Sequence, residues 1–247
     1  MTASYGQIVT TLREEILSGL YPAAVPAGAE LAARFGVSES TINRALSQLR
    51  SEGLVRTQQG RGTTVNPVPV IRRDALARQR AGTRESGGSR GAFDAELRAA
   101  GLDPRTEVEV GRATPPGTVA RLLGIPEGTE AVYRKRRMYA GDWPVQVATS
   151  WIPAGIADGT PIAEPDPGPG GIYSRLADLG HAPAEFTEEV RVRVPDDEEV
   201  TALGIDADHR VYTITRVAAD RAGRTVEVNA TVMPTHQWTL AYAWPAE

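Results

Sequence analysis

Polar side chains of the kind that read bases in DNA follow one another between positions 38 and 47. An asparagine can form two hydrogen bonds with an adenine and an arginine two with a guanine, and each good pair discriminates between bases by roughly 1–3 kcal/mol. The apolar residues of this segment recur at helical spacing, and the serine at its start is a good helix cap. We therefore predict a helix whose polar face reads DNA through Ser38, Ser40, Thr41, Asn43, Arg44 and Ser47.

Two further features of this region concern DNA. Glu39 stands in the first turn of the predicted helix. There its carboxylate interacts favourably with the helix dipole, accepts a hydrogen bond from a cytosine amino group, or repels a DNA phosphate. These three alternatives stay open. Arg61 and Gly62 lie in a glycine-rich turn that lets the backbone approach a duplex, so we predict that Arg61 reaches the minor groove. A solvated turn is the alternative.

Four consecutive cationic residues mark a different kind of site. They lie in a predicted strand over residues 132–138, where a period of two puts Arg134 and Arg136 on one face and Lys135 and Arg137 on the other. One pair is expected to face solvent. The other pair is expected to face a cleft and to clamp an anion.

The predicted DNA-reading helix needs a scaffold, and the first 65 residues provide one. Apolar residues at helical spacing predict helices over residues 5–19 and 28–35, ahead of the helix capped by Ser38. Two short segments, 54–57 and 63–65, flank the glycine-rich turn and predict a hairpin. Three helices followed by a hairpin make a winged helix-turn-helix, in which the third helix enters the major groove.

This segment resembles the GntR family of bacterial transcription regulators over about residues 5–65. The matching motifs are Tyr5-x-Gln7-Ile8, Leu31-Ala32-x-x-Phe35-Gly36-Val37-Ser38, Ala45-Leu46-x-x-Leu49-x-x-Glu52-Gly53-Leu54-Val55 and Gly60-Arg61-Gly62-Thr63. Two departures stand out. Pro26-Ala27-Gly28 replaces the family's usual Pro-Ser-Glu, and Glu39 and Asn43 stand where the family often has arginine. We therefore expect an unusual operator.

The chain divides by composition into three parts. Residues 1–66 form the predicted DNA-binding domain, and residues 67–90, rich in proline, glycine and arginine, form a predicted flexible basic linker. That linker either adds non-specific attraction to phosphates or serves as a tether. The first 90 residues hold 12 arginines against 7 acidic residues, whereas the remainder, 91–247, holds 15 cationic residues against 24 acidic ones.

An internal repeat organises residues 91–247. Leu123-Gly124-Ile125, Val132-Tyr133 and Ile152-Pro153 recur about 80 positions later as Leu203-Gly204-Ile205, Val211-Tyr212 and Met233-Pro234. Each copy predicts a short helix and a β-hairpin, so the two copies would share one antiparallel sheet flanked by helices. In the second copy Glu227 and Asn229 share a face and would bind hydroxyl or amino groups. A solvated sheet face or a dimer contact is the alternative for these polar residues.

This second part resembles the UTRA ligand-sensing domain, whose fold is like that of chorismate lyase and which follows the GntR-type reader in the HutC subgroup. The resemblance rests on Arg136 with Pro144, Ser150-x-Ile152-Pro153 and Ile172-Tyr173-x-x-Leu176-x-x-x-Gly180. It implies that Arg136, with Arg134 beside it, and Ser150 hold an anionic group of an effector. The predicted fold class is therefore α+β: a winged helix-turn-helix, then an antiparallel-sheet domain that binds an effector and dimerises.

The sequence favours a regulator over an enzyme. It has no cysteine, and its three histidines lack metal-ligand spacing, so we expect no catalytic residue, no metal and no cofactor. Its longest stretch without a charge, residues 143–157, is too short and too broken to cross a membrane. We predict a cytoplasmic homodimer that represses transcription from an inverted-repeat DNA operator and is released by a small molecule. The alternative is a small-molecule-binding protein or enzyme with a degenerate DNA reader.

Overall fold

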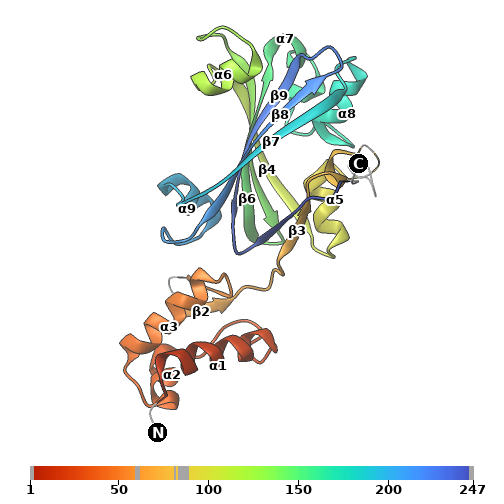
Figure 1. Ribbon diagram of the computed structural model, residues 1–247. Helices are drawn as coiled ribbons and strands as arrows, with labels where there is room; N and C mark the ends of the chain where they lie inside the picture. The colour runs from red at the N-terminus through yellow and green to blue at the C-terminus, as the bar shows by residue number, and fades with distance from the viewer. Residues whose placement is uncertain (1–2, 59–61, 81, 83–88, 245–247) are drawn as a thin grey trace. The chain divides into compact units, whose positions relative to one another are not determined.

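The computed structural model describes residues 3–58, 62–80, 82 and 89–244 (Figure 1). The chain divides into two compact units. The first comprises residues 1–69 with 205–209, and the second comprises residues 70–204 and 210–247. No helix among the described residues is long and apolar enough to cross a membrane.

The first unit is built as the sequence predicts. Its elements are α1 (Tyr5–Leu17), α2 (Gly28–Phe35), α3 (Glu39–Ser51), β1 (Val55–Gln58) and β2 (Gly62–Val65). The two strands pair antiparallel. Gly36 ends α2 with a φ of +67°, a left-handed conformation that favours glycine, and the side chain of Ser38 then caps α3.

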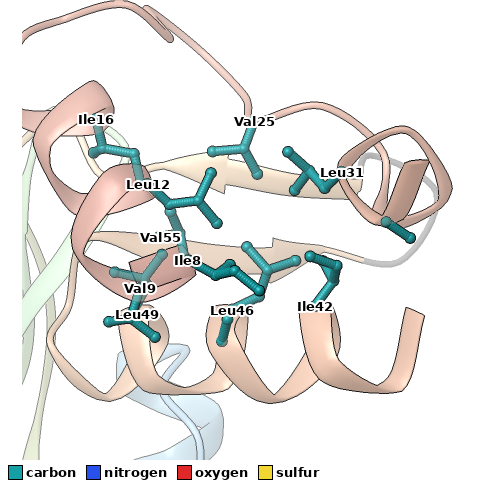
Figure 2. Packing of buried hydrophobic residues seen from close by; sticks show 12 residues of the cluster. Ile8, Val9, Leu12, Ile16, Val25, Leu31, Ile42, Leu46, Leu49 and Val55 are labelled. Atoms are coloured by element: carbon teal, nitrogen blue, oxygen red, sulfur yellow. The ribbon is translucent and has the colours of Figure 1, made fainter. Parts of the chain in front are cut away.

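The core of the first unit lies between the three helices and the hairpin (Figure 2). Ile8 and Leu12 of α1 meet Leu31 of α2 and Ile42 and Leu49 of α3, and each of these side chains is fully buried. Their burial holds α3 with its opposite, polar face turned away from the core. The apolar periodicity of the sequence therefore orients the predicted DNA-reading helix.

The second unit contains a six-stranded antiparallel sheet in the described part of the chain. Its strands are β4 (Pro104–Ala113), β5 (Ala131–Ala140), β6 (Trp143–Pro153), β7 (Pro183–Arg193), β8 (Val211–Asp220) and β9 (Thr225–Pro234). They lie in the order β4-β5-β6-β9-β8-β7, so β4 and β7 are the edges. The helices are α5 (Ala92–Ala99), α6 (Gly117–Leu123), α7 (Ala154–Ala157), α8 (Gly171–Asp178) and α9 (Asp197–Leu203), with the short 3-10 helices η1 (Ala77–Gln79) and η3 (Pro161–Ala163).

The sheet confirms the internal repeat. The hairpins β5–β6 and β8–β9 meet where β6 pairs with β9, and Thr149 faces Ala230 at the centre of that pairing. Residues 81 positions apart change places about this centre, since Ala148 faces Thr231 and Ser150 faces Asn229. The two copies of the repeat are therefore related by a local twofold axis through the middle of the sheet.

Helices cover both faces of this sheet. On one face α7, η3 and α8 pack on apolar side chains of β5, β6, β8 and β9, with Ile152 and Leu176 fully buried. On the other face α6 packs through Leu123 against Ala131 and Val228. The face beneath α8 carries the polar cavity described below.

One prediction for the segment that joins the domains was wrong. Residues 67–90 were expected to be a flexible linker, but β3 (Ile71–Asp74) pairs in parallel with β10 (Trp238–Ala241). Arg73 and Arg78 are buried in the second unit. The sequence could not reveal this because the two strands lie far apart along the chain and the short run Ile71–Asp74 shows no alternation that would predict a strand. Residues 81 and 83–88 lie outside the described residues.

Helix α2 gives a test of local stability. Its N-cap is Ala27, and no side chain in the described residues caps its first turn. Glu30 stands three positions later, so Ala27→Ser would create a reciprocal capping box. We expect this substitution to stabilise the first unit by about 1 kcal/mol.

Urea unfolding followed by circular dichroism would measure this gain. Ala29→Ser is the matched control, because it places a serine at an exposed position inside the same helix and should destabilise slightly. The unfolding transition followed by tryptophan fluorescence should be unchanged, because it reports on the second unit. All four tryptophans lie there: Trp143, Trp151, Trp238 and Trp244. Equal effects of the two serines would contradict the capping argument.

Candidate functional site

The outward face of α3 presents most of the predicted DNA-reading residues. Ser40, Asn43 and Arg44 are exposed, and Thr41 and Ser47 are half-buried. Ser38 has a structural role as well, because its Oγ accepts a hydrogen bond from the backbone N–H of Thr41 and lies 2.8 Å from the Oγ of Ser40. The helix therefore offers an asparagine, an arginine and hydroxyl groups on one accessible face.

The surroundings of α3 shape this face. The guanidinium of Arg44 lies over the ring of Tyr5, 4.6 Å from its centroid. A Cβ atom added to Gly28 would lie 3.8 Å from the side-chain oxygen of Asn43, an ordinary van der Waals distance, so the start of α2 lies close beside Asn43. Gly62 begins β2 with a φ of +71°. Arg61 lies outside the described residues.

A cavity of about 600 Å³ lies in the second unit on the α8 face of the sheet. Arg134, Arg136, Glu227 and Asn229 all line it. Lys135 lies on the opposite face and is exposed. The structure thus turns Arg134 and Arg136 toward this cavity, whereas Lys135 and Arg137 line a second cavity of about 650 Å³.

Ser150 and Glu227 form the centre of a buried hydrogen-bond network. Ser150 donates to the Oε1 of Glu227 at 2.5 Å and accepts from Arg136 at 2.7 Å and from Asn229 at 2.9 Å. The Oε2 of Glu227 accepts from Tyr173 and from Arg216, the latter at 3.3 Å. The structure therefore brings four of the five predicted effector residues into one network.

Charge holds Glu227 ionised inside the protein. Its side chain is only 1% exposed, and burial alone would raise its pKa. The charges of Arg216 and Arg136, with hydrogen bonds from Ser150 and Tyr173, instead hold the pKa of Glu227 below its ordinary value. The carboxylate thus keeps its partners in place.

Arg134 lines the cavity and is held there by backbone carbonyl groups. Its guanidinium donates to the backbone carbonyls of Ile162, Glu164 and Pro165, at 2.6 Å for the first and 2.9 Å for the last. Burial also lowers the pKa of Arg134 to about 10. The sequence could not show this, because the carbonyl groups belong to a loop about 30 positions away. Arg134 fastens that loop beside the cavity.

Comparisons with known proteins agree with this architecture. Residues 4–65 match the gntR family of bacterial regulatory proteins, and residues 99–238 match the UTRA domain. An uncharacterized HTH-type transcriptional regulator of Streptomyces coelicolor is 33% identical over 197 residues, covering 77% of this chain and 72% of its own. The histidine utilization repressor of Klebsiella aerogenes is 32% identical over 155 residues, covering 62% and 59%.

The chain belongs to the GntR family of transcription regulators, in the group that carries a UTRA domain. A crystal structure assigned to a GntR-family transcriptional regulator matches with a TM-score of 0.62 and 28% identity over 98% of both chains. These findings confirm the predicted family, the α+β fold and a DNA-binding transcription regulator.

Two cavity residues of this GntR-family regulator were missed by the sequence analysis. Tyr173 and Arg216 both contact Glu227. The internal repeat was the signal for Arg216, because it lies 80 positions after Arg136 in the matching strand. No signal in the sequence indicated that the Tyr173 hydroxyl donates into the network.

The repeat also exposes an asymmetry in charge. Arg216 forms an ion pair with Glu227, and the residue 81 positions before Glu227 is Gln146. The first copy of the repeat therefore carries a neutral glutamine at the position where the second carries the carboxylate that pairs with Arg216. The Nε of Arg136 is buried without a hydrogen-bond partner among the described residues, and so is the Oε1 of Gln146. The amide nitrogen of Gln146 donates to the sulfur of Met138 at 3.0 Å.

Acid titration tests the role of Tyr173. Ionised Glu227 stabilises the folded state above the unfolded carboxyl pKa of about 4.3, and that contribution is lost as the pH falls through the lower folded pKa. Tyr173→Phe removes one donor to the carboxylate and should lower the unfolding free energy at pH 7 by about 1.5–3 kcal/mol. The deficit should shrink in acid, where Glu227 is protonated.

Urea unfolding monitored by tryptophan fluorescence at several pH values would measure this. Tyr133→Phe is the matched control, because the Tyr133 hydroxyl donates to Glu109 on the exposed surface, where solvent screens the interaction. A deficit for Tyr173→Phe that does not change with pH would contradict the assigned role.

Proposed function

We propose that this GntR-family regulator is a cytoplasmic repressor that binds an inverted-repeat operator as a homodimer and leaves it when an anionic effector fills the cavity of the second unit. It works by binding alone, without a catalytic step. Repression is supported by the histidine utilization repressor among its relatives. An inverted repeat follows from a twofold homodimer, which presents two copies of α3 related by a dyad.

DNA reading is assigned to the exposed face of α3. Asn43 and Arg44 supply a bidentate amide and a guanidinium, and Ser40, Thr41 and Ser47 supply hydroxyl groups for bases or phosphates. Ser38 holds the N-terminus of α3, where backbone N–H groups favour a phosphate. Arg61 and Gly62 of the hairpin turn remain our candidates for the minor groove.

Arg13 and Arg34 are less available to DNA phosphates. Arg13 forms two hydrogen bonds with Glu52, at 2.7 and 2.8 Å, and Arg34 pairs with Glu15. These ion pairs leave Arg44 as the principal cation of the α3 face, together with any contribution from the turn at Arg61. The surface that we propose contacts the operator therefore carries more uncharged polar groups than cationic ones.

The anionic effector is assigned from the unequal halves of the cavity. Four cavity arginines form ion pairs and a fifth, Arg134, is held by carbonyls; the pairs are Arg78–Glu96, Arg90–Asp166, Arg98–Asp94 and Arg216–Glu227. Arg136 has neither kind of partner within the described ranges and donates only to Ser150. A carboxylate or phosphate of the effector would supply the missing ion-pair partner of Arg136. A hydroxyl or amino group beside that anion would donate to the Oε1 of Gln146.

Release of the operator on effector binding follows from thermodynamic linkage between the two sites. A ligand shifts the regulator away from operator only if it binds more tightly to the conformation that fits the operator less well. A coupling of roughly 1–3 kcal/mol changes operator affinity about 5- to 150-fold. Arg136 and Gln146, the proposed effector contacts, are where that differential affinity would arise.

Operator selection from fragments of the source genome tests the regulator. We expect the purified protein to retain a dyad-symmetric site in the presence of excess random DNA. Arg44→Ala should weaken that binding by about 1–3 kcal/mol and relax base preference, because it removes a base or phosphate contact. Arg121→Ala, which removes an exposed arginine of α6, is the control and should bind normally. Equal losses for both variants would argue against a specific role for α3.

Gln146→Glu tests the anion site. The new carboxylate would recreate beside Arg136 the ion pair that Glu227 makes with Arg216, and so occupy the place of the effector anion. Phosphate, compared with chloride at equal ionic strength, should raise the melting temperature of the unaltered protein by mass action, and this rise should disappear in the variant.

Operator binding of Gln146→Glu should persist. Lys135→Ala is the matched control, since it removes a charge from the opposite face of β5 and should keep the response to phosphate. An unchanged phosphate response in Gln146→Glu would sink the assignment of Arg136 as the anion contact.

A further inference from the structure

Arg78 lines the same cavity as Arg136, but it lies outside both segments that match known families. It belongs to η1, whereas the gntR match ends at residue 65 and the UTRA match begins at residue 99. Local bonds fix its position. After β3, the carboxylate of Asp74 accepts hydrogen bonds from the backbone N–H groups of Leu76 and Ala77, at 3.1 and 2.8 Å. The turn that follows brings Arg78 to the cavity wall.

The guanidinium of Arg78 is buried with its hydrogen-bonding capacity partly unused. The residue is 7% exposed, and its Nε has no hydrogen-bond partner among the described residues. Its ion pair with Glu96 spans 3.6 Å, which is longer than a hydrogen bond. Burial lowers the pKa of Arg78 to about 10. A buried guanidinium in this state is stabilised by an anion that accepts its N–H groups.

Glu96 offsets the charge of Arg78 only in part. Neither of its carboxylate oxygens accepts a hydrogen bond within the described residues, and burial raises its pKa. The other carboxylate of this region, Glu188, pairs with Arg73 and lies 4.0 Å from Arg216. Within the described part of the chain, Arg78 therefore has only the incomplete pair with Glu96.

The charges around the cavity favour a ligand with two negative charges. Six arginines line the cavity, and four carboxylates form the ion pairs with them that were given above for the described residues. Arg73, a seventh buried arginine beside them, is balanced by Glu188. Two positive charges are thus in excess among the described residues. A ligand of opposite charge would balance them.

Unused N–H groups decide where those negative charges would bind. Arg134 contributes charge, but its guanidinium already donates to three loop carbonyls. Arg136 and Arg78 each have a buried Nε without a hydrogen-bond partner in the described ranges. The two arginines come from different elements, β5 and η1, and they belong to different groups, since Arg136 donates to Ser150 and Arg78 pairs with Glu96. Each is therefore suited to an acidic group of its own.

We infer that the effector is an organic anion with two separate acidic groups, one bound by Arg136 and the other by Arg78. This assignment rests on the proposed function and deepens it by naming the class of effector. A cavity of about 600 Å³ has the size that encloses a small organic molecule. Because Glu96 already offsets part of the Arg78 charge, the second acidic group binds there mainly when the first group, held by Arg136, tethers it.

Straight-chain dicarboxylates, from succinate to suberate, test this assignment on the full chain. Each is compared with the ω-hydroxy monocarboxylate of the same length at constant ionic strength, and isothermal titration calorimetry measures the dissociation constants. We expect one dicarboxylate to bind about tenfold or more tightly than its hydroxy counterpart, since the second carboxylate adds a charged hydrogen bond. Equal binding of both members of every pair would overturn the assignment.

Arg78→Gln should abolish the preference for the dicarboxylate, because it removes the second cation. Arg98→Gln is the matched control. Arg98 also lines the cavity, but its side chain is 54% exposed and pairs with Asp94, so this variant should keep the preference. Equal losses in the two variants would indicate general attraction to a basic cavity and would overturn the role of Arg78.

Glu96→Gln gives a test of opposite sign, which also covers the case in which Arg78→Gln does not fold. It removes the carboxylate that offsets the Arg78 charge, so the preference for the dicarboxylate should increase by about threefold or more. Circular dichroism checks the fold of each variant. A folded Glu96→Gln protein with an unchanged or smaller preference would mean that Arg78 serves only to balance Glu96, and the assignment would be wrong.

Phosphate separates the failure of this assignment from the failure of the proposed function. If phosphate stabilises the unaltered protein and no dicarboxylate is preferred, the effector has one acidic group, and only the assignment to Arg78 is overturned. If phosphate has no effect either, the anion site at Arg136 fails, and both proposals about the effector fail together.

Discussion

A buried carboxylate needs hydrogen-bond donors and positive charges around it to offset the loss of hydration. The second unit is arranged around one such carboxylate. Glu227 lies at the middle of the sheet, and its compensation draws in Ser150 from the neighbouring hairpin, Arg216 from the adjoining strand and Tyr173 from α8. Removing one partner of a buried charge costs far more than the interaction between two exposed charges contributes. The positions of α8 and of both hairpins are therefore tied to the ionisation of a single side chain.

The same constraint explains why the two halves of the cavity differ. The repeat places an arginine in each hairpin, but only the second copy has a carboxylate beside it. In the first copy Gln146 stands in that position, so Arg136 forms no ion pair among the described residues. A symmetrical fold thus holds an asymmetrical cavity, and that asymmetry is the basis of the proposed anion site.

The first unit depends on a simpler constraint. Apolar side chains of three helices and a hairpin share one core, and that core turns the polar face of α3 outward (Figure 2). Local chemistry sets the helix limits, through Gly36 at the end of α2 and Ser38 at the start of α3. Since these signals lie within a few residues of the elements they control, this part of the fold could be predicted in detail.

The sequence by itself therefore determined the helices of the first unit, the repeat of the second and the antiparallel hairpins, and it put Arg134 and Arg136 on one face of β5 without deciding which face meets a cavity. All of these follow from periodicity and from signals close together along the chain. Only the tertiary structure decided that β3 pairs with β10, that Arg134 binds carbonyls of a loop, and that Tyr173 joins Glu227. Those contacts join residues 28 to 167 positions apart, and no local pattern specifies which distant partner a strand or a guanidinium will meet.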